Sequence, residues 1–145
     1  MTLKIPGTNF DFIVSPAYFL AEFDVFDREE DLGEELNKYD PNNPADLKAL
    51  FNKYMFSGKI VERYSIKHKE ALAKKLEETL SNTEFDFVEL IESMLEAEDG
   101  FSLPSKWVIE NPRLFFLEAY KAIYNTWGND INNSGGKLKE PSELE

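Results

Sequence analysis

The sequence contains no cysteine and only one histidine, His68. The absence of cysteine excludes disulfides, thiolate metal sites and cysteine nucleophiles. Ser-His-Asp chemistry and zinc hydrolysis need a histidine in a shaped pocket, and the helical di-iron pattern needs two histidines. Because His68 lies in the lysine-rich run 67–70 (KHKE), we expect it to be an ordinary surface residue.

The motifs of nucleotide and ester chemistry are also missing. There is no Gly-rich phosphate loop, no G-x-S-x-G elbow and no dinucleotide-binding fingerprint. Glu89 and Glu92 would act as general acid and base only if one of them were buried, and the pattern puts both on a polar face. The best match to a calcium loop, 130–135 (DINNSG), has Pro141 in place of the bidentate glutamate. We therefore predict a protein without catalytic residues, metal or cofactor.

Long apolar runs are absent, and none approaches the eighteen residues of a membrane-spanning helix. The first residues lack the basic start and apolar stretch of a signal peptide. Neither secretion nor membrane spanning is indicated. Together with the absence of cysteine, this predicts a cytoplasmic protein.

The sequence contains enough apolar residues to form the core of one domain. The 145 residues are 42% hydrophobic and include twelve Phe, six Tyr and two Trp, so disorder is not expected. We predict a single helical domain over 1–128. Residues 129–145 are rich in Gly, Asn, Ser and charge, with almost nothing to bury, and predict a flexible, disordered C-terminal tail.

Apolar residues repeat at three- and four-residue spacing, which predicts an all-α bundle of five to six helices. Three of the helix starts combine a capping residue with proline: Ser15-Pro16, Asn43-Pro44 and Asn111-Pro112. Ser65 is expected to cap another, and Thr83 with Asp86 resembles a capping box. The predicted helices span 16–26, a marginal 29–39, 44–56, 66–80, 84–98 with its stop at Gly100, and 112–127. Residues Phe10–Val14 fit an extended segment without a visible partner.

The last of these helices is apolar over most of its circumference, which predicts a central position in the core. Arg113 turns toward an apolar sector of this helix. We expect it to have a structural role at the core margin, and the alternative is a buried ion pair with Glu110 or with an acid of the first helix.

The net charge of −12 is concentrated in two blocks. Residues 1–35 hold nine acidic and two basic residues, and residues 84–111 hold eight acidic residues and one basic residue. The intervening 36–83 carry a net charge of +3, and 112–145 carry −1. The two blocks are the strongest signal in the sequence.

We interpret both blocks as partner-binding surfaces. In the second block, Glu89, Glu92 and Glu96 lie within about 60° of one another on a helix, and Phe85 projects into the same sector, as an aromatic interface residue with a charged rim would. The other interpretation is a soluble outer face with Phe85 folded back near the helix start. The candidate residues of the first block fall within fourteen positions: Glu22, Asp24, Asp27, Glu29, Glu30, Asp31, Glu34 and Glu35.

Such a charge favours a basic protein partner and argues against nucleic acid and anionic membranes. The leading hypothesis is an acidic inhibitor, an immunity protein that neutralises a basic nuclease toxin of bacteria. One alternative is a phage-type DNA mimic that blocks a nucleic-acid-binding defence protein. Another is a non-catalytic structural or adaptor protein that self-associates, and a homodimer stays open under it.

Overall fold

Described residues cover 3–96 and 102–145 of the chain in this computed structural model. Within these ranges the protein is helical and has no strand, which confirms the predicted all-α class. The α helices are α1 (Tyr18–Ala21), α2 (Glu34–Leu36), α3 (Pro44–Tyr54), α4 (Ile66–Ser81), α5 (Phe87–Leu95) and α6 (Pro112–Asn133). Three short turns of other helix types are η1 (Glu29–Gly33), η2 (Val61–Arg63) and η3 (Pro141–Leu144).

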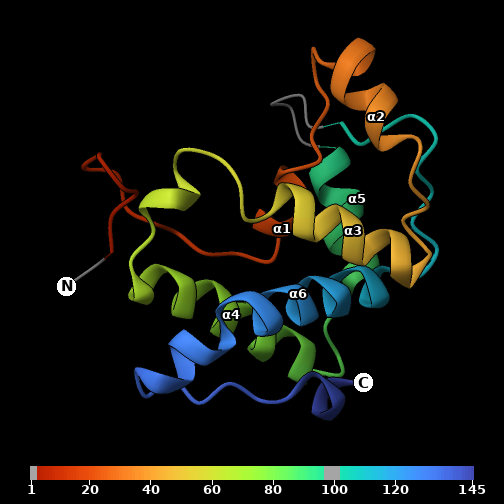
Figure 1. Cartoon of the computed structure of the whole chain (residues 1–145). Coiled ribbons are helices and arrows are strands. Elements are labelled where there is room, and N and C mark those ends of the chain that lie inside the picture. The colour runs from red at the N-terminus through yellow and green to blue at the C-terminus, as the bar shows by residue number, and fades with distance from the viewer. Residues whose placement is uncertain (1–2, 97–101) are drawn as a thin grey trace.

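Helix α6 runs through the middle of the molecule, between α3 and α4 (Figure 1). Its side chains from Phe115 to Tyr120 are all buried, as the apolar circumference predicted. Aromatic rings fill the space around it: Phe115 meets Phe51 at 5.1 Å and Phe23 at 6.0 Å, both edge to face. Such ring pairs are stabilising beyond the area that they bury, so this cluster fixes how α3 and α6 pack.

Two of the proline-marked helix starts are confirmed. The side chain of Asn43 accepts hydrogen bonds from the amides of Ala45 and Asp46, and that of Asn111 accepts one from Leu114. Ser65 also caps α4 as expected.

The third proline-marked start, at Ser15-Pro16, was wrong. Helix α1 begins only at Tyr18, lasts four residues and has no side-chain cap. The chain leaves helical geometry early because tertiary hydrogen bonds replace helical ones: the amide of Val25 bonds to the carbonyl of Ser102 at 2.8 Å, and the Asp24 carboxylate accepts from the amide of Ser102 at 3.0 Å. Phe26, the last residue of the predicted helix 16–26, lies outside α1 and is 52% exposed.

The sequence predicted a capping box formed by Thr83 and Asp86. In the structure, Asp86 itself is the N-cap of α5. Its carboxylate accepts a 3.0 Å hydrogen bond from the amide of Glu89. Helix α5 then ends at Leu95, and the predicted stop at Gly100 lies outside the described residues.

The N-terminal segment pairs with itself. Lys4 and Asp11 form an antiparallel bridge and an ion pair, and a turn at Gly7, with φ of +80°, connects the two sides. The extended segment Phe10–Val14 therefore does have a partner, which lies only a few residues upstream.

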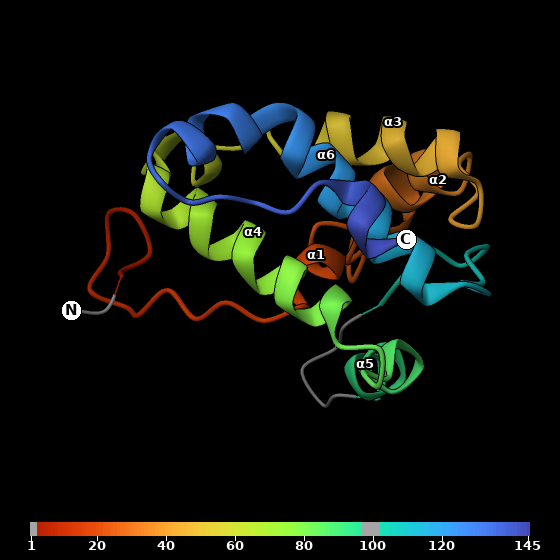
Figure 2. The same ribbon diagram turned by 90° about the horizontal axis from the view of Figure 1, so that it is seen from below.

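Helix α6 continues through Gly128 to Asn133, beyond its predicted end at Trp127. The chain then turns back along α4 and α6 (Figure 2). Leu138 and Leu144 are buried, so the segment 129–145 has more to bury than its composition suggested. Its mobility stays a prediction.

Candidate protein-interaction surface

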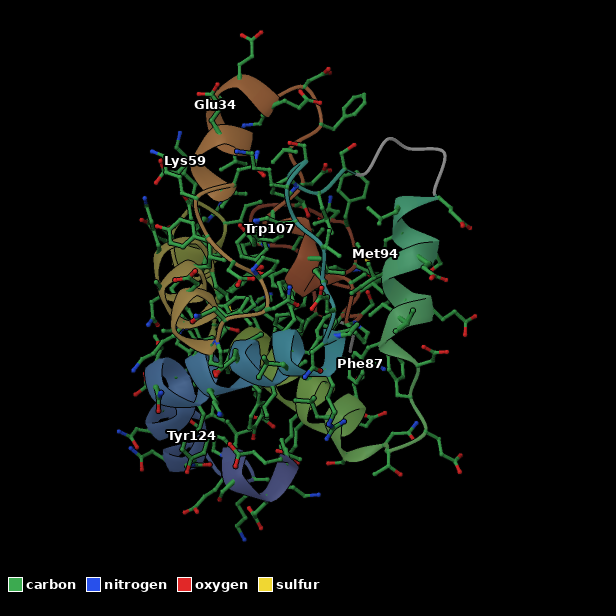
Figure 3. The ribbon with its side chains drawn as sticks, turned by 90° about the vertical axis from the view of Figure 1, so that its right-hand side faces the viewer. Glu34, Lys59, Phe87, Met94, Trp107 and Tyr124 are labelled. Carbon is green, nitrogen blue, oxygen red and sulfur yellow. The ribbon has the colours of Figure 1, made fainter. Side chains whose placement is uncertain are left out.

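Most carboxylates of the first acidic block lie on the surface of η1 and α2. Glu34 marks this end of the molecule, at the top of Figure 3. Among the eight candidate residues of the block, the exposed ones are Asp27, Glu29, Glu30, Asp31 and Glu34. Three of them are in one turn of π-type helix, and Arg28 is the only base within this stretch.

The other three candidate residues, Glu22, Asp24 and Glu35, are only partly exposed. Asp24 accepts hydrogen bonds from the amides of Phe26 and Ser102, which fixes the chain after α1. Glu35 accepts bonds from the ammonium groups of Lys38 at 3.2 Å and Lys53 at 3.3 Å, and these bonds lower the pKa of its carboxyl group.

Glu22 is half-buried, and burial raises the pKa of its carboxyl group. Nearby, the hydroxyl groups of Tyr18 and Tyr64 lie 2.9 Å apart, and burial raises the pKa of both phenols. Asp24 and Glu35 therefore connect neighbouring segments, and Glu22, Asp24 and Glu35 are the candidate residues with the least free surface.

The second acidic block presents a stripe along α5. Glu89, Glu92 and Glu96 are all exposed, as predicted. In the part of the chain that the structure describes, none of the three forms an ion pair. Like charges at this spacing repel by a few tenths of a kcal/mol per pair, and no lysine of α5 relieves that repulsion.

Phe85 lies just before α5 and is half-buried. Its ring meets the ring of Phe87 edge to face at 4.8 Å, and Phe87 in turn stacks on Phe116 of α6 at 4.9 Å. Its position matches the interpretation in which Phe85 folds back, and a role in partner binding stays a prediction.

Beside the acidic stripe, the structure shows an apolar groove that the sequence analysis missed. It lies between α5 and the segment 103–112 and has a volume of about 250 Å³. We call it the α5 groove. Its lining residues are Val88, Ile91, Glu92, Leu95, Leu103, Trp107, Val108, Ile109 and Pro112. The seven-residue spacing of Val88 and Leu95 could have indicated the α5 side of the groove, whereas nothing local places Val108 opposite them.

The two acidic blocks are in contact through Ser102. This residue, which follows α5 in the chain, bonds to Asp24 and Val25 within the first block. Figure 1 shows α2 and α5 in the upper right of the view, and Figure 2 shows that they lie apart, with α5 below the rest of the molecule. The two blocks therefore form two separate acidic surfaces.

His68 is not the surface residue that the sequence predicted. It is buried, and its Nδ1 accepts a bond from the amide of Ser65 at 3.1 Å. Its Nε2 therefore carries the proton and donates to the carbonyl of Lys4 at 2.7 Å. The lysines beside His68 in sequence point elsewhere because the helix turns by about 100° per residue.

Arg113 has the structural role expected of it. One nitrogen of its guanidinium group donates to the carbonyl oxygens of Leu80 at 2.9 Å and Leu144 at 2.7 Å. Backbone carbonyls thus take the place of the carboxylate considered as an alternative.

Two further findings concern the described ranges, 3–96 and 102–145. They contain no group of three or more acidic or histidine side chains placed to hold a metal ion. No helix in them combines the length and the apolar character needed to cross a membrane.

No protein-family model, curated protein sequence or solved structure matches this chain.

Proposed function

We propose that this chain is a non-catalytic acidic protein that binds a basic protein, and that it acts as an immunity protein against a nuclease-type bacterial toxin. The observation that carries the proposal is the stripe of exposed carboxylates on α5, which has no ion-pair partner in the described residues and runs beside an exposed apolar groove. Soluble surfaces usually mix charges of both signs.

The acidic surface would affect the association rate, and the apolar groove beside it would affect the affinity. A nuclease carries positive charge where it holds phosphate, and an inhibitor with a concentrated negative surface is steered toward it. Steering of this kind raises association rates by about tenfold to a thousandfold at low ionic strength. Apolar contacts beside the charges then slow dissociation.

The proposal is tested by a pull-down from lysate of the source cell at low salt, eluted with a salt gradient and identified by mass spectrometry. We expect one basic nuclease to elute at high salt. Retention of a basic DNA-binding defence protein would favour the DNA-mimic alternative, and retention of copies of this chain alone would favour the self-associating one. A gradient that releases no basic protein would overturn the proposal.

A further inference from the structure

The exposed apolar side chains of this protein are concentrated at the α5 groove. Of the seven large apolar side chains that are exposed in the described ranges, three line this one groove: Val88, Leu95 and Val108. Val108 is 66% exposed, Val88 is 50% and Leu95 is 44%. Isolated exposed apolar residues are common, but several around one concavity indicate an interaction site.

The floor and the walls of the groove are held in place by the core. The indole nitrogen of Trp107 donates a 2.8 Å hydrogen bond to the carbonyl of Leu36, and its ring packs against Phe23 at 5.4 Å. On the other side, Phe87 fixes the start of α5 against α6. Figure 3 shows α5 standing at the edge of the molecule, with Met94 on α5 and Trp107 on the opposite segment. The groove is therefore formed before a partner arrives.

The shape of the groove suits side chains of another protein. Its volume of about 250 Å³ is below the range of about 300–1,000 Å³ that drug-sized ligands occupy. Val88 and Leu95 are seven residues apart on one edge of α5, which corresponds to about 10 Å along the axis. A partner helix that lies along α5 would place apolar side chains over this distance at positions i, i+3 or i+4, and i+7.

The charge around the groove indicates which charged residues the bound segment carries. Leu95 and Val88 form an exposed apolar edge of α5. Measured around the helix axis from Leu95, the carboxylates of Glu92, Glu96 and Glu89 all lie within about 120°. A bound segment thus meets apolar surface in the groove and carboxylates along one side. These carboxylates repel anionic lipid, and the net charge of −12 disfavours a second copy of this chain.

We propose that the α5 groove binds an amphipathic helical segment of the partner protein, with two or three aliphatic side chains in the groove and lysine or arginine residues facing the carboxylates of α5. This inference rests on the proposed function, because it assumes a basic protein partner. The inference adds the place where the partner binds, the α5 groove, and the side chains that the partner contributes there.

The test uses two fluorescein-labelled peptides of sixteen residues with the same lysines. One has leucines along a single helical face, and the other has alanine in place of every leucine. Fluorescence polarisation measures their affinity for the full-length protein at low salt, and the indole signal of Trp107 in ¹H–¹⁵N spectra, assigned with the Trp127→Phe variant, reports filling of the groove.

We expect the leucine peptide to bind at least about tenfold more tightly than the alanine peptide and to shift the Trp107 signal. Leu95→Gln and Val108→Gln should each weaken binding of the leucine peptide about fivefold and leave the alanine peptide unaffected. Ile60→Gln is the matched control, because Ile60 is 52% exposed but lies outside the groove, and it should change neither affinity.

Equal affinities for the two peptides, no binding of the leucine peptide, or no effect of Leu95→Gln would overturn the inference. It would also be overturned if size-exclusion chromatography showed a dimer that Leu95→Gln dissociates, since the occupant would then be a second copy. None of these results decides the proposed function, which depends on the basic protein retained in the pull-down.

Discussion

Arg113 donates a 2.7 Å hydrogen bond to the carbonyl oxygen of Leu144, and so joins the first turn of α6 to the last residues of the chain. The same nitrogen bonds to Leu80 near the end of α4. Because backbone carbonyls at the end of a helix lack helical partners, a guanidinium group there satisfies groups that would otherwise be left unpaired. The C-terminal segment is thus connected to two helices through one side chain.

The first prediction concerns the anchoring of this segment. Leu144 is 3% exposed, so Leu144→Ala should lower the free energy of unfolding by about 2 kcal/mol in urea titrations. Leu95→Ala is the control with the same chemical change at a residue that is 44% exposed, and it should cost less than about 1 kcal/mol. Equal, small effects of both changes would show that the segment moves freely, as its composition predicted.

The second prediction concerns His68 as the link between α4 and the N-terminal segment. His68→Ala removes the bond to the Lys4 carbonyl and half of the capping box with Ser65, which should cost about 2 kcal/mol. Hydrogen exchange should then accelerate at the amides of Ile5 and Phe12, which donate to the carbonyls of Phe10 and Leu3, respectively, across the N-terminal turn. Lys67→Ala, at an exposed neighbour, should leave both quantities unchanged. A loss of stability without faster exchange at these amides would contradict the link.

The third prediction concerns pH and the half-buried carboxyl group of Glu22. Its pKa in the folded protein is raised by burial above the ordinary value of 4.5, so this group favours folding below pH 4.5 and loses that contribution as the pH rises through the raised pKa. Glu22→Gln should therefore increase Tm at pH 7 and have no effect well below pH 4.5. A lower Tm for the variant at pH 7 would mean that the charged carboxylate is stabilising.

Glu35 provides the opposite case for the fourth prediction. Its hydrogen bonds to Lys38 and Lys53 lower the pKa of its carboxyl group, so its contribution is present above pH 4.5 and is lost as the pH falls through the lowered pKa. Glu35→Gln should decrease Tm at pH 7 by a small amount, because the ion pairs are exposed, and the decrease should disappear in acid. An effect of the same size in acid would show that the ion pairs are not its cause.

Much of this fold follows from local sequence signals. Asn43-Pro44 and Asn111-Pro112 mark helix starts through the capping amide and the missing proline N–H, and the all-round apolar character of 112–127 predicted the central helix. These signals act within one or two turns of helix, so a single segment carries them in full.

The parts that were missed depend on residues distant in sequence. Helix α1 is short because Ser102 bonds to Asp24 and Val25, and His68 is buried because the N-terminal segment folds over it. The α5 groove has the same origin. The acidic stripe on α5 was predictable from helical spacing, whereas the apolar surface beside it needs Val108, which only the tertiary fold places there.

The central claim is that the carboxylates of α5 steer a basic partner, and association kinetics test it most directly. Stopped-flow experiments would compare the wild type with three triple variants of equal net charge. The α5 variant combines Glu89→Lys, Glu92→Lys and Glu96→Lys, and the variant of the first block combines Glu29→Lys, Glu30→Lys and Glu34→Lys. The last variant combines Glu62→Lys, Glu78→Lys and Asp130→Lys. All nine positions are exposed, and the last set lies outside both acidic blocks.

The partner in this experiment is the basic protein recovered by the salt-gradient pull-down. The account predicts that the α5 variant associates at least about tenfold more slowly than the wild type at low ionic strength, that the last variant is slowed much less, and that high salt removes the difference. Unchanged association of the α5 variant, or equal slowing by all three variants, would contradict it, because the binding would then depend on net charge alone or not on charge at all.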